Sequence, residues 1–429
     1  MTTDITSEVI PLVEYGEVEL DLARGDVAHL VEVTAGRFRV SQNPMSHAYR
    51  VNPQQYVGVV PLPSGRRIVV QPKVPISSVA HMLAIVHGLP EWGSELAPFS
   101  AVEDLLDHAA MQLVMAIEQQ LQTGLQRKYV SEADNLTLVR GRINFASNLR
   151  HNYGLQHRIY CEYTELMWDI PENQVLRQAL RAALGTVRSS AVRGRMMDVD
   201  IELAEVAVGQ YSPSVFDRFD YHRGNWSYQA LHALSRLFIE GASLGERAGS
   251  VTARAFLVDM NLLFEDFVRR ILRQSITSGV TVTKRDIDLD EHSKLSVTPD
   301  LLFQQGGVTY LVADCKYKAL TSGWMVDDVY QLLSYCVAEH VDRGVLFYPS
   351  IGAAGDGPLI VRGTGIEIRK VPVDLSQPVE HLSLLGPRLL EIVAPSRVID
   401  RNGRDVDRGT GPSRARQDSP EATAVGLRP

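Results

Sequence analysis

The stretch VTPDLLFQQGGVTYLVADCKYK, from Val297 to Lys318, decides how the C-terminal part of this chain folds. It contributes to two apolar strand candidates, Leu295–Phe303 and Val308–Lys318. Between them, Gln304–Gly307 contains the paired glycines that favour a tight connection. The second candidate reads as core until it ends in Asp-Cys-Lys-Tyr-Lys. The stretch therefore predicts a β-hairpin whose open end carries charged side chains.

Two carboxylates are expected to meet at that open end. A turn centred on the two glycines sets Asp300 opposite Asp314, or within about one residue of it. Opposed side chains in an antiparallel pair have β-carbons roughly 4.5–5.5 Å apart. Carboxylates that close repel each other unless a cation lies between them, and Mg²⁺ prefers carboxylate and water oxygens. We therefore predict that Asp300 and Asp314 bind Mg²⁺, with Mn²⁺ as an alternative metal.

Two lysines follow Asp314 on the same strand face, because side chains alternate along a strand. Lys316 is placed to hold and polarise a water beside the metal, and Lys318 to contact a phosphate. The alternative is a salt-bridged strand end, since Asp-x-Lys is expected about once by chance in a chain of this length. The preceding Pro-Asp at the matching hairpin offset favours the catalytic interpretation.

The segment DMNLLFEDFVRRILRQ predicts a helix that begins after Asp259, a residue type favoured at the N-cap. Glu265 lies on or beside the apolar stripe of this helix. One interpretation is a boundary residue paired with Arg269. The other is a third acid that faces the metal pocket, and the sequence leaves both open.

The segment DDVYQLLSYCVAEH predicts a second helix, with Gln331 and Tyr335 four residues apart on one face. Such a pair can be a satisfied polar edge. Beside an acidic metal pocket it can instead hold a phosphate or position the catalytic strand. We therefore treat both residues as supporting members of the candidate site.

Composition limits the class of protein. The chain has 429 residues, is 45% hydrophobic and 22% charged, and is expected to form two or three domains. No apolar run is long enough to span a membrane. Three cysteines without a Cys/His cluster predict reduced thiols, a cytoplasmic location and no zinc site. The net charge of -8 means that any grip on nucleic acid must be local or shared with a partner.

The predicted fold is mixed α+β, in four parts. Residues 1–95 read as a β-rich domain, and 96–245 as a mainly helical connecting region. Residues 246–395 read as an α/β unit that holds the candidate site. The tail 396–429 is rich in Gly, Pro, Ser, Arg and Asp, and is expected to be disordered.

The order of Glu265, Asp300, Asp314-x-Lys316 and Gln331-xxx-Tyr335 resembles the PD-(D/E)xK nuclease superfamily, with the Q-xxx-Y addition of RecB-type nucleases. Longer segments are similar to the McrC family of modification-dependent restriction systems. In the C-terminal half these are MNLLFEDFV, TPDLLF, DCKYK and DDVYQLLSY. In the N-terminal half they are YVGVVPLPSGRRIVVQPKVP, LVRGRI and CEYTELMWDIPENQVLRQAL. The resemblance covers roughly residues 10–390.

The resemblance implies a Mg²⁺-dependent DNA endonuclease with a PD-(D/E)xK, restriction-endonuclease-like domain. Asp300, Asp314 and Glu265 would be its metal ligands and Lys316 its catalytic lysine. It also implies a partner, a McrB-like AAA+ GTPase hexamer that recognises modified, 5-methylcytosine-type DNA. The N-terminal half would dock on that ring and stimulate its GTPase. GTP would be bound by the partner, since this chain has no Gly-Lys pair and therefore no phosphate loop of the Walker type.

The run from Arg140 to Arg158 has four arginines, two histidines and no acid. Arginines can stabilise the negative charge that builds up during GTP hydrolysis, so Arg140 and Arg142 are candidates for stimulating the partner. A solvated basic loop or a contact with the DNA backbone explains the run as well.

Two other functions stay open for the whole chain. One is a catalytically silent adaptor of an AAA+ ring. The other is a ring-coupled nuclease that does not depend on DNA modification.

Overall fold

The computed structural model describes most of the chain and combines helices with several separate sheets. None of its described helices is long and apolar enough to cross a membrane. The described residues are 8–88, 102–153, 157–243, 255–276, 279–290, 292–318, 323–350, 357–375, 384–394, 398–399 and 405–406.

The N-terminal part is built on a four-stranded sheet of order β1-β6-β5-β10. It contains β1 (Val9–Val13), β5 (Tyr56–Pro61) and β6 (Arg67–Gln71), with β1 parallel to β6. A smaller sheet pairs β2 (Val18–Leu20) and β3 (Arg39–Gln42) with β4 (Tyr49–Asn52), and α1 (Arg24–Thr34) packs with both sheets around one apolar core. The predicted strands are therefore present, together with one helix.

The middle of the chain is a group of packed helices. They are α2 (Ile76–His87), α3 (Val102–Thr123), α5 (Pro171–Leu184), α6 (Ser190–Glu202), the 3-10 helix η1 (Pro213–Arg218) and α7 (Tyr228–Ser243). Pro171 opens α5, where its missing N–H costs nothing.

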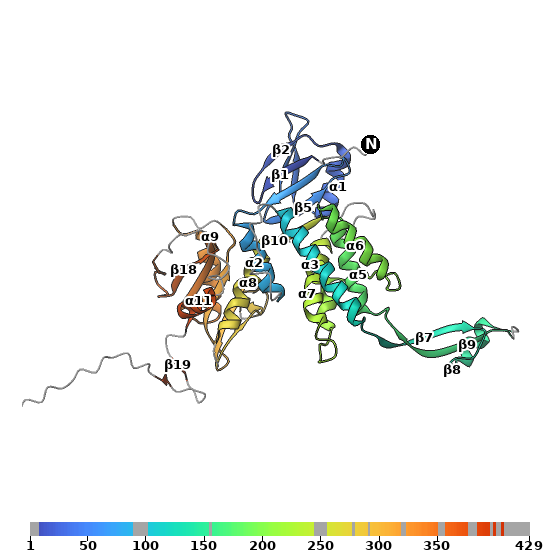
Figure 1. Cartoon of the computed structure of the whole chain (residues 1–429). Coiled ribbons are helices and arrows are strands. Elements are labelled where there is room, and N and C mark those ends of the chain that lie inside the picture. The colour runs from blue at the N-terminus through green and yellow to red at the C-terminus, as the bar shows by residue number, and fades with distance from the viewer. Residues whose placement is uncertain are drawn as a thin grey trace, which may run out of the picture.

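A β-arm extends from these helices, away from the other parts of the molecule (Figure 1). It consists of β7 (Lys128–Leu136), β9 (Ile159–Met167), the short β8 (Arg142–Ile143) and α4 (Phe145–His151). This segment lies in the region 96–245, predicted from the sequence to be mainly helical, and the sheet corrects that prediction. Most of its side chains are exposed or half-buried, and β7 lacks the regular alternation of apolar and polar residues that marks a packed strand.

The chain then returns to the first sheet. β10 (Phe256–Asp259) pairs antiparallel with β5, and α8 (Met260–Ser275) follows at once. The Asp259 side chain caps α8 by accepting from the N–H groups of Asn261 and Leu262. The helix that carries Glu265 is thus anchored at its start to the N-terminal sheet.

The C-terminal unit is a six-stranded sheet of order β11-β14-β15-β16-β18-β17. Its strands are β11 (Val280–Thr283), β14 (Leu301–Gln305), β15 (Val308–Cys315), β16 (Arg343–Ser350), β17 (Leu359–Ile360) and β18 (Glu367–Asp374). Helices α8 and α11 (Leu385–Val393) cover one face, and α9 (Val326–Ala338) covers the other. Side chains alternate between these faces: Leu311 and Ala313 face α8, whereas Val312 faces α9.

The predicted hairpin is present with shorter strands than expected. The candidate Leu295–Phe303 is divided into β13 (Ser296–Val297), which pairs with β12 (Ile287–Asp288), and β14, which begins at Leu301. Pro299 lies in the break, because it has no N–H for a ladder hydrogen bond. β15 ends at Cys315, although the Lys316 N–H still donates to the Phe347 carbonyl at 2.8 Å. The lysines therefore follow the strand and do not lie within it.

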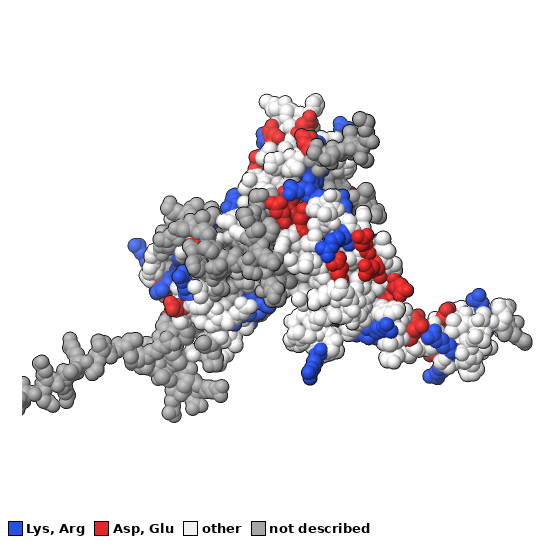
Figure 2. Space-filling view, viewed as in Figure 1, with Lys and Arg blue, Asp and Glu red and all other residues white. Residues whose placement is uncertain are grey.

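The expected disordered tail lies mostly outside the described residues. Within 396–429 the structure describes one short strand pair, β19 (Val398–Ile399) with β20 (Asp405–Val406). Over the described residues of the face in view, acidic and basic side chains are interspersed without a continuous basic surface (Figure 2). This distribution agrees with the net negative charge of the chain.

Candidate functional site

Asp300 and Asp314 meet at the open end of the hairpin. Leu301 pairs with Ala313, so the register places the two acids opposite each other. The Cys315 N–H donates to Asp300 Oδ2 at 2.8 Å. Burial, and then repulsion from Asp314, raises the pKa of Asp300 to about 6. Burial also raises the pKa of Asp314, whose side chain is almost completely enclosed.

Lys316 points to the same side of the sheet as Asp314. Its ammonium lies 2.5 Å from Asp314 Oδ2 and donates to Gln331 Oε1 at 2.7 Å. Burial lowers the pKa of Lys316, but the Asp314 carboxylate outweighs it, and the net effect is a raised pKa. Lys316 is therefore held in its charged form beside the two acids.

Gln331 and Tyr335 of α9 support the lysine. Gln331 Nε2 donates to the Tyr335 hydroxyl at 2.6 Å while its oxygen accepts from Lys316. Tyr335 is buried in the core between α9 and the sheet. Of the roles expected from the sequence, these contacts favour positioning of the segment that carries Lys316.

Glu265 shows features of both interpretations left open by the sequence. It pairs with Arg269 Nη1 at 2.8 Å, as a boundary residue would, yet it is buried. Its Oε1 also lies 2.5 Å from Lys284 Nζ, which in turn lies 3.7 Å from Asp300 Oδ1. Glu265 is thus connected to Asp300 through the Lys284 ammonium.

Lys318 pairs with Asp328 Oδ1 at 2.9 Å, and the second oxygen of Asp328 accepts from the Tyr348 hydroxyl at 2.9 Å. The Lys318 side chain remains 43% exposed, so a phosphate can still approach it. Asp328 is buried at the first turn of α9. This contact joins the segment after β15 to α9 a second time, next to the contact between Lys316 and Gln331.

The donor atoms suit a hard divalent cation. Within the described residues, no group of three or more His, Cys, Asp and Glu side chains is already arranged around a metal position. Lys284 bridges two of the three acids instead. Asp314 Oδ2 is buried and has no hydrogen bond of normal geometry, despite its close ion pair with Lys316. The two aspartates therefore retain oxygens that Mg²⁺ or Mn²⁺ can bind.

The N-terminal part also reaches this site. The Tyr317 hydroxyl, one residue after Lys316, donates to Glu14 Oε1 at 2.9 Å in a buried contact. The Tyr15 hydroxyl donates to Asn261 Oδ1 at 2.9 Å, beside the start of α8. Residues just after β1 thus contact both the segment that follows β15 and the helix that carries Glu265.

Arg140 and Arg142 lie elsewhere, on the β-arm. Arg140 makes two contacts with Glu165, at 3.1 and 3.2 Å, and its guanidinium stacks over the Tyr163 ring. Arg142 is exposed in β8. The structure does not bring these arginines together with the acidic site.

The sequence analysis missed four residues that contact the site: Glu14, Lys284, Tyr317 and Asp328. Lys284 had a usable signal, because it directly follows the β-branched strand β11, which runs antiparallel to β14 and so ends near Asp300. Asp328 is part of the quoted α9 segment. The Glu14–Tyr317 contact joins residues 303 positions apart, and no local pattern indicates it.

Comparisons with known proteins agree on one family. The sequence model described as "McrBC 5-methylcytosine restriction system component" matches residues 51–349. A relative from Escherichia coli K12, described as "Type IV methyl-directed restriction enzyme EcoKMcrBC", is 20% identical over 342 residues. That match covers 73% of this chain and 97% of the relative.

A solved structure supports the fold. It is a chain of a half-complex described as Thermococcus gammatolerans McrB AAA+ hexamers with bound McrC. The TM-score is 0.56 at 19% identity, and the match covers 90% of this chain and all of the other.

Proposed function

The chain belongs to the McrBC 5-methylcytosine restriction system component family, and from that premise we propose that it is the endonuclease subunit of such a system. The observation that carries this proposal is the contact of Asp300, Asp314 and Lys316 at the open end of one hairpin. This arrangement is what a PD-(D/E)xK site requires. The proposed reaction is hydrolysis of DNA phosphodiester bonds with Mg²⁺.

In this proposal Asp300 and Asp314 hold the cation, and Glu265 contributes directly or through a water. Mg²⁺, when bound, would polarise a phosphoryl oxygen and favour deprotonation of the attacking water. The Lys316 ammonium orients that water and offsets the negative charge that develops on the phosphate. Water oxygen forms the new bond to phosphorus, while the bond to the leaving sugar oxygen breaks. Gln331 keeps Lys316 directed toward the phosphate.

Lys284 adds a positive charge between two of the acids. Its ammonium lies between Glu265 and Asp300, so it neutralises part of the charge that a cation would otherwise balance. Because the Lys284 side chain is flexible and one-third exposed, it can withdraw when the cation binds.

The partner in this proposal is a McrB-like AAA+ GTPase that reads the modified base, and the β-arm is its contact surface. The arm carries exposed apolar side chains at Leu138, Phe145, Leu149 and Tyr153, each more than half exposed. Apolar groups gathered on a projecting element are typical of protein interaction surfaces. The exposed Arg140 and Arg142 lie in the same segment, where they can act on the GTPase of the ring.

The test is DNA cleavage by the purified chain with its partner, GTP and Mg²⁺. We expect Asp314→Ala and Lys316→Ala each to reduce cleavage at least about a hundredfold, because each removes a group that stabilises the transition state. Stimulation of the partner GTPase should persist in both. Asp327→Ala, which removes an exposed acid of α9 from the same unit, serves as the matched control.

Other outcomes separate the alternatives. Cleavage by Asp314→Ala at the wild-type rate would contradict the assigned site. A wild-type chain that stimulates the GTPase but never cleaves would be the silent adaptor. Equal cleavage of modified and unmodified DNA would identify a ring-coupled nuclease without modification dependence.

A further inference from the structure

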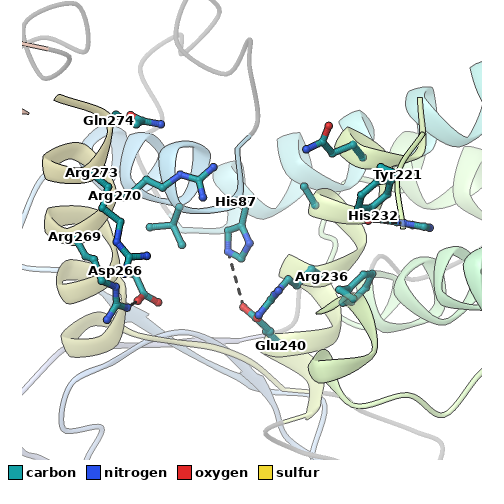
Figure 3. Close-up of a pocket in the computed structure, with 14 residues that line it drawn as sticks. His87, Tyr221, His232, Arg236, Glu240, Asp266, Arg269, Arg270, Arg273 and Gln274 are labelled. Carbon is teal, nitrogen blue, oxygen red and sulfur yellow. Dashed lines mark hydrogen bonds and ion pairs between the residues drawn. The ribbon is translucent and has the colours of Figure 1, made fainter. Parts of the chain in front are cut away.

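A cleft of about 620 Å³ lies between α7 and α8, beside the candidate active site and separate from it. At about 30 Å³ per water, it has room for roughly twenty waters. Figure 3 shows Arg269, Arg270 and Arg273 on the α8 side, Arg236 and Glu240 on the α7 side, and His87 of α2 between them. Four arginines and two acids line it, an excess of positive charge in a protein with a net charge of -8.

Two of the four arginines are neutralised by acids. Arg236 pairs with Glu240 at 2.6 Å and Asp217 at 3.0 Å. Arg269 pairs with Glu265 and with Asp266. These pairs build the walls of the cleft and leave little charge for a ligand.

Arg270 and Arg273 are different. Within the described part of the chain, neither has an acidic partner, and both are exposed. Arg273 donates through Nε to the Val282 carbonyl at 3.1 Å, which orients its side chain and leaves the outer guanidinium nitrogens available. Burial, and then repulsion from Arg269 and Arg270, lowers the pKa of Arg273. An anion bound among Arg269, Arg270 and Arg273 would therefore reduce the repulsion between their guanidinium groups.

The two histidines that line the cleft add no positive charge to it. Burial lowers the pKa of His232 to about 4, and burial also lowers the pKa of His87, so both are neutral at neutral pH. Tyr221 and His232 are hydrogen-bonded to each other at 2.9 Å. The arginines are thus the source of positive charge that an incoming ligand meets.

The position of the cleft indicates which anion it takes. Glu265, Arg269 and Arg273 are spaced four residues apart on α8, so they follow one side of the helix in steps of roughly 6 Å. The acid lies at the candidate active site and the arginines lead away from it. A length of about 12 Å along the B-form DNA axis corresponds to roughly three to four phosphates on each strand.

We propose that this cleft binds the sugar-phosphate backbone of the DNA strand next to the phosphate that is cleaved, with Arg270 and Arg273 as its phosphate ligands. The inference rests on the proposed nuclease function. The cleft would be the local DNA-binding surface that a chain of net negative charge requires. The contacts are to phosphate, so they hold any sequence and leave base recognition to the partner.

The experiment measures binding of the full chain to a fluorescent DNA duplex in EDTA, where no cleavage occurs, over a range of salt concentrations. Arg270→Ala/Arg273→Ala should weaken binding at low salt by about tenfold or more. It should also reduce the slope of log affinity against log salt by about 0.9 for each lost phosphate contact. Arg270→Lys/Arg273→Lys keeps the charge and should retain most of the slope.

The matched control is Arg362→Ala/Arg388→Ala, which removes two exposed arginines from the same C-terminal unit but outside the cleft. An equal loss in the control, an unchanged slope in the cleft variant, or a wild-type chain that does not bind DNA at low salt would each overturn the proposal. Displacement of DNA from the wild type by free GTP would also overturn it, in favour of a nucleotide site.

Binding in EDTA is independent of catalysis, so the two proposals can fail separately. A reduced slope in a chain that never cleaves would retain the cleft and reject the nuclease. Normal binding and cleavage by the cleft variant would reject the cleft and retain the nuclease.

Discussion

At the scale of single residues, the site contains a repulsive interaction between two mostly buried carboxylates. Asp300 and Asp314 lie next to each other in a mostly buried environment, and burial and mutual repulsion raise the pKa of Asp300 to about 6. Lys284 and Lys316 offset part of that charge. Such a cluster lowers the stability of the fold but provides oxygens that can bind a cation. Lower stability of this kind is common at functional sites.

The sign of the pH dependence follows from this pKa. The pKa of Asp300 in the folded chain lies above its ordinary value of 3.8. Its contribution to stability is therefore fully present below about pH 4 and is lost as pH rises through about 6. In the absence of metal, ionised Asp300 should therefore lower the free energy of unfolding at neutral and alkaline pH.

Asp300→Asn keeps the shape of the side chain and removes its charge. In EDTA near pH 8 we expect it to raise the free energy of unfolding by up to about 3 kcal/mol, and near pH 4 to have little effect. Denaturant unfolding at the two pH values measures this difference. Asp327→Asn, on the exposed side of α9, should show no pH-dependent gain; an Asp300→Asn chain no more stable than wild type near pH 8 would contradict the assignment.

At the scale of elements, α8 connects the parts of the molecule. Its N-cap residue Asp259 belongs to β10, which pairs with β5 of the N-terminal sheet. Its buried face packs on the C-terminal sheet, with Glu265 close to Asp300 through Lys284. Further along the helix, Arg270 and Arg273 line the cleft. The placement of β10 therefore sets the position of both functional surfaces.

The pairing of β10 with β5, which positions α8, can be tested at Gly58 of β5. A β-carbon at Gly58 would lie 1.9 Å from the Phe256 carbonyl oxygen of β10, and its φ of +150° disfavours other residues. We expect Gly58→Ala to lower the free energy of unfolding by about 3 kcal/mol or more and to reduce cleavage. Thermal unfolding and hydrogen exchange of β10 and the first turn of α8 would measure it.

Gly25→Ala is the control, because a β-carbon there meets nothing within 4 Å in α1. Its effect on unfolding should stay within about 1 kcal/mol. Wild-type protection of β10 from hydrogen exchange in Gly58→Ala would show that this strand tolerates the substitution. It would contradict the expectation that Gly58 is required for the pairing of β5 with β10.

At the scale of the whole molecule, the two candidate activities lie far apart. The β-arm projects away from the C-terminal unit, and the middle helices lie between them (Figure 1). Glu14 and Tyr15, just after β1, contact Tyr317 and Asn261 of the C-terminal unit. A partner bound to the arm and the N-terminal part would therefore act on the candidate site through packed structure.

Arg140→Ala/Arg142→Ala tests the role of the arm in the full-length chain. Both arginines are exposed, so their loss should leave the free energy of unfolding close to that of the wild type. We expect stimulation of the partner GTPase to fall about tenfold or more. The assay is GTP turnover by the partner ring at saturating chain.

Arg223→Ala/Arg388→Ala removes two exposed arginines away from the arm and should leave stimulation unchanged. Full stimulation by the Arg140→Ala/Arg142→Ala chain would reject these two arginines. Salt-dependent DNA binding would then test the basic run as a DNA contact.

The sequence by itself determined what depends on local order. The two glycines and the alternation of the strands placed Asp300 opposite Asp314, with Lys316 on the same face. Helical spacing put Gln331 and Tyr335 on one side of α9, and the structure confirms their contact. The apolar stripe of α8 predicted a buried helix with Glu265 at its edge. These relations extend over few residues, so strand and helix periodicity are enough to fix them.

Only the tertiary structure decided how distant segments meet. Strand β7 of the β-arm lacks a regular apolar alternation because most of its side chains are exposed or half-buried, so its periodicity gives little strand signal. Lys284 reaches Glu265 and Asp300, and Glu14 reaches Tyr317, through packing between elements far apart in the chain. The cleft lined by four arginines exists because side chains of α7 and α8 face each other across it. Such contacts depend on where whole elements are placed, which local periodicity does not encode.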